Sequence, residues 1–398
     1  MDSGAEGRVR SFRSGAREAR VPCRSLLELR PLQERGAHLP GSQGGVPQHA
    51  RRMLAGRSVR ARQPANSRSG EGGGGHMRIV LVTPSTGTIP PERDGGTERV
   101  IHDLCDGLVE LGHEVYQYAA HGSRARAVQL PYPFRQFPEL EIGRFVHYSM
   151  PKGIDIINDH TFSSVLSQYS WDVPLVSSRH VPYLSQARNP VYVSETMLKT
   201  IGMGQGHYIH NGIATEHYPL GERKQDYLLF VGRIIPDKGA AQAIDVAEEA
   251  DMNLVIAGPM DDEAYFKALI EPRLKRNPRI SYAGPVGGQK RQSLLKHARC
   301  LLFPSQWQEP FGLAIIEAFA CGTPVLALDR GAVREVLKGY PSFVCETIPE
   351  MARKLHSLDA WAAPSELRKY VEANFHRRKM VDEYLRLYRH CIEAPTPS

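Results

Sequence analysis

The sequence of 398 residues lacks features that would point to several classes of protein. It has no run of about 18 apolar residues, which a membrane-spanning helix would need. Its six cysteines never occur in C-x-x-C spacing, which argues against a disulfide framework or a zinc site. The cysteines are Cys23, Cys105, Cys300, Cys321, Cys345 and Cys391. We therefore expect free, buried thiols in a reducing compartment, and hence a cytoplasmic location.

Lysine is absent from residues 1–76, which hold 14 arginines and six acidic residues. This segment therefore carries a charge of +8, whereas the whole chain carries +7, so the remainder is nearly neutral at −1. Arg, Gly, Ser and Pro dominate the segment without sustained periodicity, and we predict a disordered extension that precedes a functional start at Met77. An organellar transit peptide and a nucleic-acid-binding arm are alternatives for this segment. For the folded part we expect no nucleic-acid partner.

From Met77 the sequence alternates between strand and helix patterns, as a doubly wound parallel sheet requires. The strand 79–83 leads into a loop with the pair Gly95-Gly96, and an apolar helix face follows. Two later strands end in His160 and His180, at the sheet edge where open α/β folds bind ligands. The pattern favours one domain over 77–212, with a further helix near 139–148.

A polar linker over 213–226 precedes a second alternating series over 227–378. Its first strand runs into a loop that contains Arg233 and Lys238. Arg can fork two phosphate oxygens and Lys supplies a point charge, so this loop suits a phosphate. A single helix is expected near 263–275, and a last helix with one apolar face is expected near 379–391, followed by a tail to 398.

The most informative stretch reads E-P-F-G-L-A-I-I-E from Glu309 to Glu317 and continues A-F-A-C-G-T-P. Pro310 suits the first position of a helix and Gly322 suits the residue just past its end. A helix that began there would place Glu317 about two turns deeper than Glu309. Its N-terminus would offer backbone N–H groups to an anion.

This stretch resembles the signature of the retaining, nucleotide-sugar-dependent glycosyltransferases of family four. Three other strings resemble that family: its glycine-rich loop at Gly95-Gly96, its G-R-x-x-x-x-K-G clamp at 232–239, and its T-x-H at His180. The resemblance covers nearly all of 77–392 and is weak over 121–152.

The resemblance implies an α/β fold of the GT-B type. Two Rossmann-like doubly wound domains would face a cleft, with 77–212 binding the acceptor and 227–378 binding the donor. The segment 379–398 would contain a helix that crosses back to the first domain.

It also implies roles around the donor sugar. Glu309 would lie near the reacting carbon and His180 beside the sugar. The backbone N–H groups of Phe311, Gly312 and Leu313 would bind sugar hydroxyls.

The remaining roles concern the nucleotide. The resemblance assigns Glu317 to the ribose hydroxyls, and Arg233, Lys238 and the Gly95-Gly96 backbone to the diphosphate. No two aspartates of the chain are separated by one residue, so the D-x-D motif of metal-dependent transferases is absent. We therefore expect catalysis without a metal or a cofactor.

The expected function is retaining transfer of a sugar to an unidentified acceptor: a glycan, a lipid or a small molecule. A lipid acceptor would imply peripheral contact with a membrane. Alternatives are another GT-B enzyme, such as a nucleotide-sugar epimerase or a phosphorylase, and a non-catalytic protein that binds sugar nucleotides.

Overall fold

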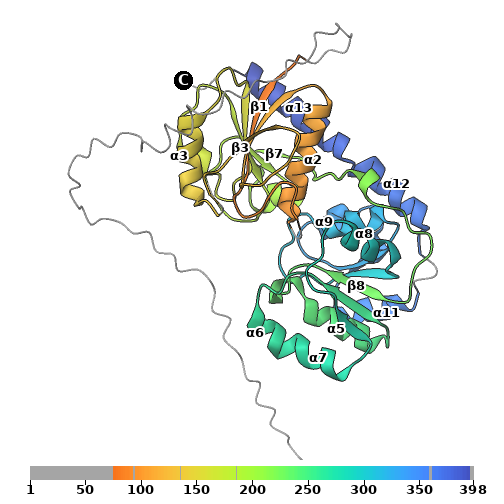
Figure 1. The fold of residues 1–398 in the computed structure, drawn as a ribbon. Helices are drawn as coiled ribbons and strands as arrows, with labels where there is room; N and C mark the ends of the chain where they lie inside the picture. Colours follow the sequence, from red (N-terminus) through yellow and green to blue (C-terminus); the bar gives the residue numbers. More distant parts are fainter. Residues whose placement is uncertain (1–74, 93–94, 135, 185, 358–360, 395–398) are drawn as a thin grey trace, which may run out of the picture. The chain divides into compact units, whose positions relative to one another are not determined.

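A computed structural model describes residues 75–394 except 93–94, 135, 185 and 358–360 (Figure 1). All of these belong to one unit of the chain, which begins at Gly73. The predicted extension over 1–76 therefore lies outside the described residues, apart from its last two. Within the described part, no helix is long and apolar enough to cross a membrane. The cysteines there are all free, and only Cys391 among them is not buried, whereas Cys23 lies outside the described residues.

Seven parallel strands form the first sheet, in the order β3-β2-β1-β4-β5-β6-β7. They are β1 (Arg78–Val82), β2 (Glu114–Ala119), β3 (Val128–Pro131), β4 (Ile156–Asp159), β5 (Leu175–Arg179), β6 (Pro190–Tyr192) and β7 (His207–Tyr208). In the middle, Val80 lies opposite Tyr116 on one side and Ile157 on the other. The strand order reverses between β1 and β4, which makes this pair the topological switch point of the sheet.

The helices of this half agree with the expected alternation. They are α2 (Gly96–Glu110), α3 (Glu139–Ser149), α4 (Glu195–Thr200) and the 3₁₀ turns η1 (Val165–Gln168) and η2 (Thr215–His217). The helix expected near 139–148 is confirmed as α3. Strand β3 was not predicted, because it is a short edge strand with no buried residue and so shows no alternation between buried and exposed positions.

The second sheet has six parallel strands in the order β10-β9-β8-β11-β12-β13. They are β8 (Leu228–Val231), β9 (Leu254–Ala257), β10 (Ile280–Tyr282), β11 (Cys300–Phe303), β12 (Val325–Leu328) and β13 (Val344–Cys345). The two sheets confirm the prediction of two Rossmann-like α/β halves. The predicted domain boundaries at 212, 226 and 378 remain predictions.

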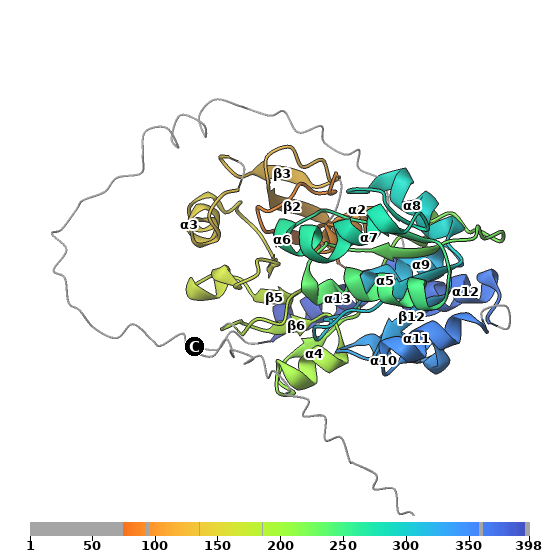
Figure 2. The ribbon, with the colours of Figure 1, turned by 90° about the horizontal axis from the view of Figure 1, so that it is seen from below.

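Helices cover both faces of the second sheet (Figures 1 and 2). They are η3 (Pro236–Lys238), α5 (Ala240–Glu249), α6 (Glu263–Tyr265), η4 (Phe266–Ile270), α7 (Glu271–Arg276), α8 (Gly288–His297), α9 (Leu313–Ala320), α10 (Val333–Val336), η5 (Pro341–Phe343), α11 (Ile348–Leu355) and α12 (Pro364–Asn374). Because side chains alternate along a strand, Leu228 and Phe230 of β8 pack in the core under α5 and α11, whereas Leu229 and Val231 pack in the core under α8 and α9.

The helix expected near 263–275 is present as three consecutive helical segments, α6, η4 and α7. The turn η4 is a π-helix between α6 and α7, and Pro272 follows it at the start of α7. A proline ring removes one N–H and crowds the carbonyl four residues earlier, which a wider π-turn relieves.

The last helix, α13 (Arg377–Glu393), packs on the first half of the protein (Figure 1). Tyr388 accepts a hydrogen bond of 2.6 Å from Asn158 in β4, and Tyr384 bonds Ser178 in β5 at 2.9 Å. The predicted crossing is therefore confirmed. The helix begins two residues earlier than expected, because the ring of His376 accepts a hydrogen bond from the Arg378 N–H and caps it.

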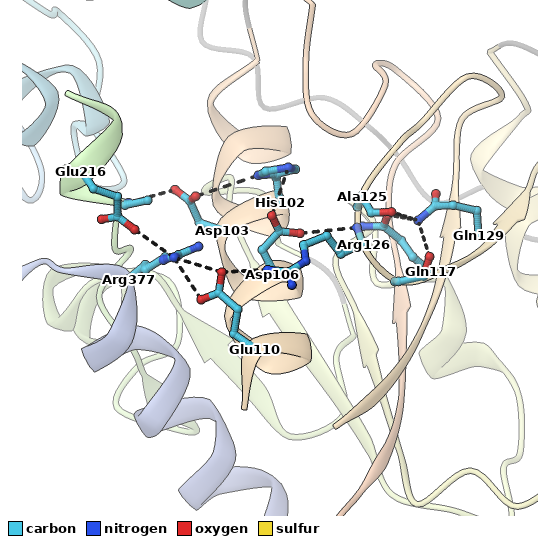
Figure 3. A network of polar contacts seen from close by, with 12 residues as sticks. His102, Asp103, Asp106, Glu110, Gln117, Ala125, Arg126, Gln129, Glu216 and Arg377 are labelled. Carbon is cyan, nitrogen blue, oxygen red and sulfur yellow. Dashed lines mark hydrogen bonds and ion pairs between the residues drawn. The ribbon is translucent and has the colours of Figure 1, made fainter. Parts of the chain in front are cut away.

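Arg377 joins three segments at the start of this helix (Figure 3). Its guanidinium lies 3.0 Å from the carboxylate of Glu110 in α2 and 2.9 Å from that of Glu216 in η2. In the same region the backbone N–H of Ala214 donates to Asp103 of α2. The segment predicted as a polar linker is thus tied to both α2 and α13.

Candidate active site

The stretch Glu309–Glu317 forms a loop followed by α9. The prediction that Pro310 begins the helix is wrong, because α9 starts at Leu313 and is preceded by Gly312 with φ of 94°. That left-handed conformation favours glycine. The carbonyl of Pro310 instead accepts a hydrogen bond of 2.7 Å from Ser194, at the start of α4 in the first half.

Because the helix starts late, Glu317 lies about one turn inside it rather than two. The other end agrees with the prediction: Gly322 follows the helix with φ of 70°, and its N–H donates to the carbonyl of Phe319.

The Glu309 carboxylate receives three hydrogen bonds on one oxygen. Oε2 accepts from Lys238 Nζ at 2.8 Å, from Trp307 Nε1 at 2.8 Å and from Ser305 Oγ at 3.1 Å. The main-chain carbonyl of Glu309 accepts from the N–H of Ala332. None of the described residues donates a hydrogen bond to Oε1. The carboxylate is thus fixed through one oxygen while the other is left for a ligand.

Lys238 and Glu309, two of the predicted site residues, therefore form an ion pair. Lys238 Nζ also lies 4.7 Å from the centroid of the Trp307 ring, within range of a cation–π contact. Sequence reasoning missed Trp307, although its place two residues before Glu309 was a usable signal.

Arg233 lies in the same loop after β8 but is held differently. Its side chain is 45% exposed, and its nearest carboxylate, that of Asp261, is 4.0 Å away. No ion pair or hydrogen bond is found between Arg233 and either Lys238 or Glu309, all of which are described. A contact this long and exposed contributes little, so the guanidinium is available to a ligand.

Glu317 is fully buried. This burial was not expected for a residue that is predicted to bind the ribose hydroxyls of a ligand. Oε1 lies 3.0 Å from Arg99 Nε and accepts from the Tyr218 hydroxyl at 3.0 Å, while Oε2 accepts from Arg291 Nε at 3.1 Å. Burial alone would raise the pKa of Glu317, but the charges of Arg291 and Arg99 outweigh it and lower the pKa. The carboxylate is therefore ionised between two guanidinium groups, one from each half of the protein.

The Gly95-Gly96 pair lies against the start of α9. Gly95 has φ of 149°, and a Cβ there would lie 2.8 Å from a carboxylate oxygen of Glu98. A Cβ on Gly96 would lie 3.1 Å from Cδ1 of Leu313. The structure thus brings the glycine pair of the first half to the helix N-terminus of the second half.

His160 and His180 contact each other at the ends of β4 and β5. His160 Nδ1 and His180 Nε2 are 2.9 Å apart, and the two rings are stacked. Burial lowers the pKa of His180 to about 4, aided by Arg179, and burial lowers the pKa of His160 well below its usual value. Both rings are therefore neutral, and one donates to the other. No hydrogen bond or ion pair links His180 to the described residues Glu309 and Lys238.

Phe311 is a core residue. It is 2% exposed, and its ring packs 5.6 Å from that of Phe375 and 5.9 Å from that of His210. Only its backbone can take part in the predicted contact with sugar hydroxyls.

Glu335 of α10 makes another contact between the two halves. Its carboxylate accepts from the N–H groups of Glu195 and Thr196 at 2.7 and 2.8 Å, and from His210 at 2.5 Å. Burial would raise the pKa of Glu335, but the hydrogen bonds from His210 and Thr196 lower it to about 2. The first turn of α4 is thus capped by a carboxylate from the other half.

No cluster of three or more His, Cys, Asp or Glu residues that could hold a metal ion occurs within the described part of the chain. The candidate site consists of cations, carboxylates and backbone groups.

Two family models match adjoining parts of the chain. The model "Glycosyltransferase Family 4" matches residues 94–217, and "Glycosyl transferases group 1" matches residues 214–373. The junction of the two matches lies between the two sheets.

Curated relatives are similar over parts of their length. An uncharacterized glycosyltransferase of Methanocaldococcus jannaschii is 35% identical over 28% of this chain and 29% of that protein. A second one from the same organism is 30% identical, and the match spans 38% of its length. The phosphatidyl-myo-inositol mannosyltransferase of Mycolicibacterium smegmatis is 25% identical over 66% of this chain and 78% of that protein.

Solved structures match over most of the chain. AviGT4, a glycosyltransferase involved in avilamycin A biosynthesis, is 27% identical with a TM-score of 0.68, over 81% of this chain and all of that one. HepE of Anabaena, solved with UDP-glucose, shares the fold at 18% identity and a TM-score of 0.64, over 79% of this chain and all of that one. Since the two family matches together span 94–373 and the two parallel sheets agree with these structures, the chain belongs to the family 4, group 1 glycosyltransferases and has their GT-B fold.

Proposed function

We propose that the chain transfers a sugar from a nucleotide diphosphate sugar to a hydroxyl group of an acceptor, with retention of configuration and without a metal ion. The observation that carries the proposal is the Lys238–Glu309 pair, together with the exposed Arg233 in the same loop as Lys238. HepE, which shares the fold, was solved with UDP-glucose, and this supports a nucleotide-sugar donor.

The diphosphate leaving group needs positive charge where its own charge develops, and preorganised donors supply this with little reorganisation. Lys238 already lies in a partly buried ion pair, so a diphosphate would compete with Glu309 for its ammonium group. The exposed Arg233 guanidinium can fork two phosphate oxygens. These fixed cations and the backbone N–H groups of the glycine pair stabilise the negative charge of the leaving diphosphate, as a metal ion does in D-x-D enzymes.

We propose that configuration is retained because the acceptor hydroxyl attacks the anomeric carbon from the same face from which the phosphate leaves. Glu317 is buried between Arg99 and Arg291 and does not act as a nucleophile. Glu309 is fixed by three donors and orients the sugar through its other oxygen. The departing phosphate then accepts the proton of the acceptor hydroxyl.

The test combines donor binding with one variant. Thermal shifts of the full chain are measured with UDP-, GDP-, ADP- and dTDP-sugars in the presence of a chelator. A donor at about 100 times its Kd should add about 2.7 kcal/mol of stability. Arg233→Ala should keep the melting temperature of the free protein and lower kcat/KM by roughly 10²-fold.

Arg353→Ala, a change of an exposed arginine in α11, is the matched control and should leave kcat/KM unchanged. An unchanged rate in Arg233→Ala would refute the assignment of that residue. Consumption of inorganic phosphate, or conversion of the sugar nucleotide without an acceptor, would favour the phosphorylase or epimerase alternatives. No stabilisation by any of the four series would contradict the proposed donor.

A further inference from the structure

A cavity of about 320 Å³ lies in the first half of the protein. Its lining includes Ser85, Thr86, Gln136, Phe137, Glu139 and Phe162. Ser85 and Thr86 follow β1, and Phe162 follows β4. Since β1 and β4 are the switch point of the first sheet, the cavity lies where open α/β sheets bind their ligands, outside the carboxyl ends of the strands.

The cavity adjoins the glycine pair of the proposed donor site. The Thr86 hydroxyl donates to Glu98 Oε1 at 3.1 Å. The other oxygen of Glu98 is the atom that a Cβ on Gly95 would meet at 2.8 Å. One carboxylate thus supports both the wall of the cavity and the loop assigned to the diphosphate.

Two aromatic rings line the cavity. Phe137 is only 9% exposed and is held by an aromatic cluster, stacked on Tyr132 at 5.6 Å and edge-on to Phe145 at 5.8 Å. Phe162 is half-buried. A fixed aromatic face suits the flat C–H face of a ring.

The polar groups of the cavity are chiefly acceptors. Glu139 Oε1 accepts from the Ser163 N–H at 2.8 Å, and within the described part Oε2 has no partner. Ser85 donates its hydroxyl proton to the carbonyl of Phe137 at 2.6 Å, which leaves its oxygen able only to accept. A ligand rich in hydroxyl donors matches this set.

Among the described residues, the one charged side chain of the lining is the carboxylate of Glu139. An anionic ligand would meet a like charge there. The volume of the cavity lies at the lower end of the range for ligand sites, which fits a single ring.

We propose that this cavity is the acceptor site and that it takes an uncharged, polyhydroxylated ring, one sugar or cyclitol unit, in preference to a phosphorylated one. This inference rests on the proposed function. In the reaction, an oxygen of the ring forms the new bond to the anomeric carbon, the bond from that carbon to the phosphate oxygen breaks, and the hydroxyl proton passes to the departing phosphate.

Ligand-observed saturation-transfer NMR on the full chain tests the inference. The probes are myo-inositol and methyl α-D-mannopyranoside, measured beside myo-inositol 1-phosphate and mannose 6-phosphate. We expect the neutral rings to bind at least about tenfold more tightly than the phosphorylated ones, which is the scale expected from one like-charge contact of about 1.4 kcal/mol.

Two substitutions locate the binding. Glu139→Gln keeps an oxygen for the Ser163 N–H but removes the charge, so the preference should shrink to less than about threefold, and Glu139→Lys should reverse it. The matched control is Glu141→Gln, an exposed carboxylate of the same helix outside the cavity, which should change nothing.

Equal or tighter binding of the phosphorylated rings, absence of binding by both neutral rings, or a preference that Glu139→Lys leaves in place would overturn the inference. The donor thermal shift separates the two proposals. If a nucleotide sugar stabilises the protein but neither neutral ring binds, only the acceptor inference is refuted. If a ring binds but no nucleotide sugar raises the melting temperature, the proposed sugar transfer is refuted.

Discussion

Trp307 joins the two charged groups of the candidate site, because its indole N–H bonds Glu309 and its ring faces the ammonium group of Lys238. The side chain itself carries no charge. Its part is to fix the geometry of the residues that do, and a hydrogen bond to a charged group is worth about 1.5–3 kcal/mol.

Trp307→Phe removes the N–H and keeps an aromatic face. We expect kcat/KM for the stabilising donor to fall by about tenfold or more, with a melting temperature close to that of the wild type. Steady-state kinetics and thermal unfolding of the same preparation check this. Trp361→Phe, which changes a partly buried indole packed against the core of the second half, is the control for loss of an indole. Wild-type kinetics in Trp307→Phe would show that Lys238 and Ser305 hold Glu309 by themselves.

Glu317 is a different kind of residue, because its carboxylate is fully buried and pairs with the buried Arg291 and the partly buried Arg99. Breaking a buried pair by removing one partner typically costs about 3–5 kcal/mol. Glu317→Gln should therefore lower the free energy of unfolding by about 3 kcal/mol or more.

Urea unfolding measures this loss. The control is Glu372→Gln, which breaks the exposed pair with Arg368 on α12 and should cost less than about 1 kcal/mol. If Glu317→Gln has the same free energy of unfolding as the wild type, the carboxylate does not stabilise the fold, and its role would be limited to binding the ribose. Loss of donor binding in a Glu317 variant therefore does not by itself identify a ribose contact, and Arg233→Ala is the cleaner test.

At the scale of elements, the contact of α13 with α2 depends on a small residue. Gly107 lies in the last turn of α2, and a Cβ there would lie 2.6 Å from Cγ2 of Val381 in α13. Two effects therefore oppose each other in Gly107→Ala. The better helix propensity of alanine gains up to about 1 kcal/mol, whereas overpacking costs about 1–3 kcal/mol.

We expect overpacking to prevail, so Gly107→Ala should lower the melting temperature. In a Val381→Ala background the same substitution should become neutral or stabilising, because the clashing methyl group is gone. Thermal unfolding of the two single variants and the double variant gives the answer. Additive losses would mean that α13 shifts to accommodate the methyl group.

The helix starts show why elements are easier to predict than their ends. The apolar spacing of Ile316 and Phe319 predicts a helix there, and both are fully buried. Which residue begins α9 depends on the hydrogen-bond donor to the carbonyl of Pro310. That donor is Ser194, 116 positions earlier in the chain. A local sequence pattern cannot predict a hydrogen-bond partner so far away in the chain.

At the scale of the whole molecule, Glu335 makes one of the contacts between the two halves, and its pKa of about 2 makes this contact sensitive to acid. The folded pKa lies below the ordinary value of 4.5, so the stability it supplies is complete above 4.5 and is lost as the pH falls from 4.5 towards 2. The shift corresponds to roughly 3 kcal/mol at neutral pH.

Glu335→Gln should be less stable than the wild type at pH 7, and the difference should shrink as the pH falls below 4.5. Urea unfolding of both proteins from pH 7 to pH 3 measures this convergence. A difference that stays constant across this range would contradict the assigned pKa. Glu346→Gln, a change of an exposed carboxylate after β13, is the control.

The sequence by itself determined the two parallel sheets, the crossing helix and the strings that mark the family, because hydrophobic periodicity and short motifs are local properties of the chain. Only the tertiary structure decided that Lys238 pairs with Glu309, that Glu317 is enclosed by Arg99 and Arg291, and that the Glu139 cavity opens beside the glycine loop. Glu317 and Arg99 are 218 positions apart in the chain, and no periodic pattern connects them. Burial and charge pairing at such distances arise only when two sheets fix which loops meet.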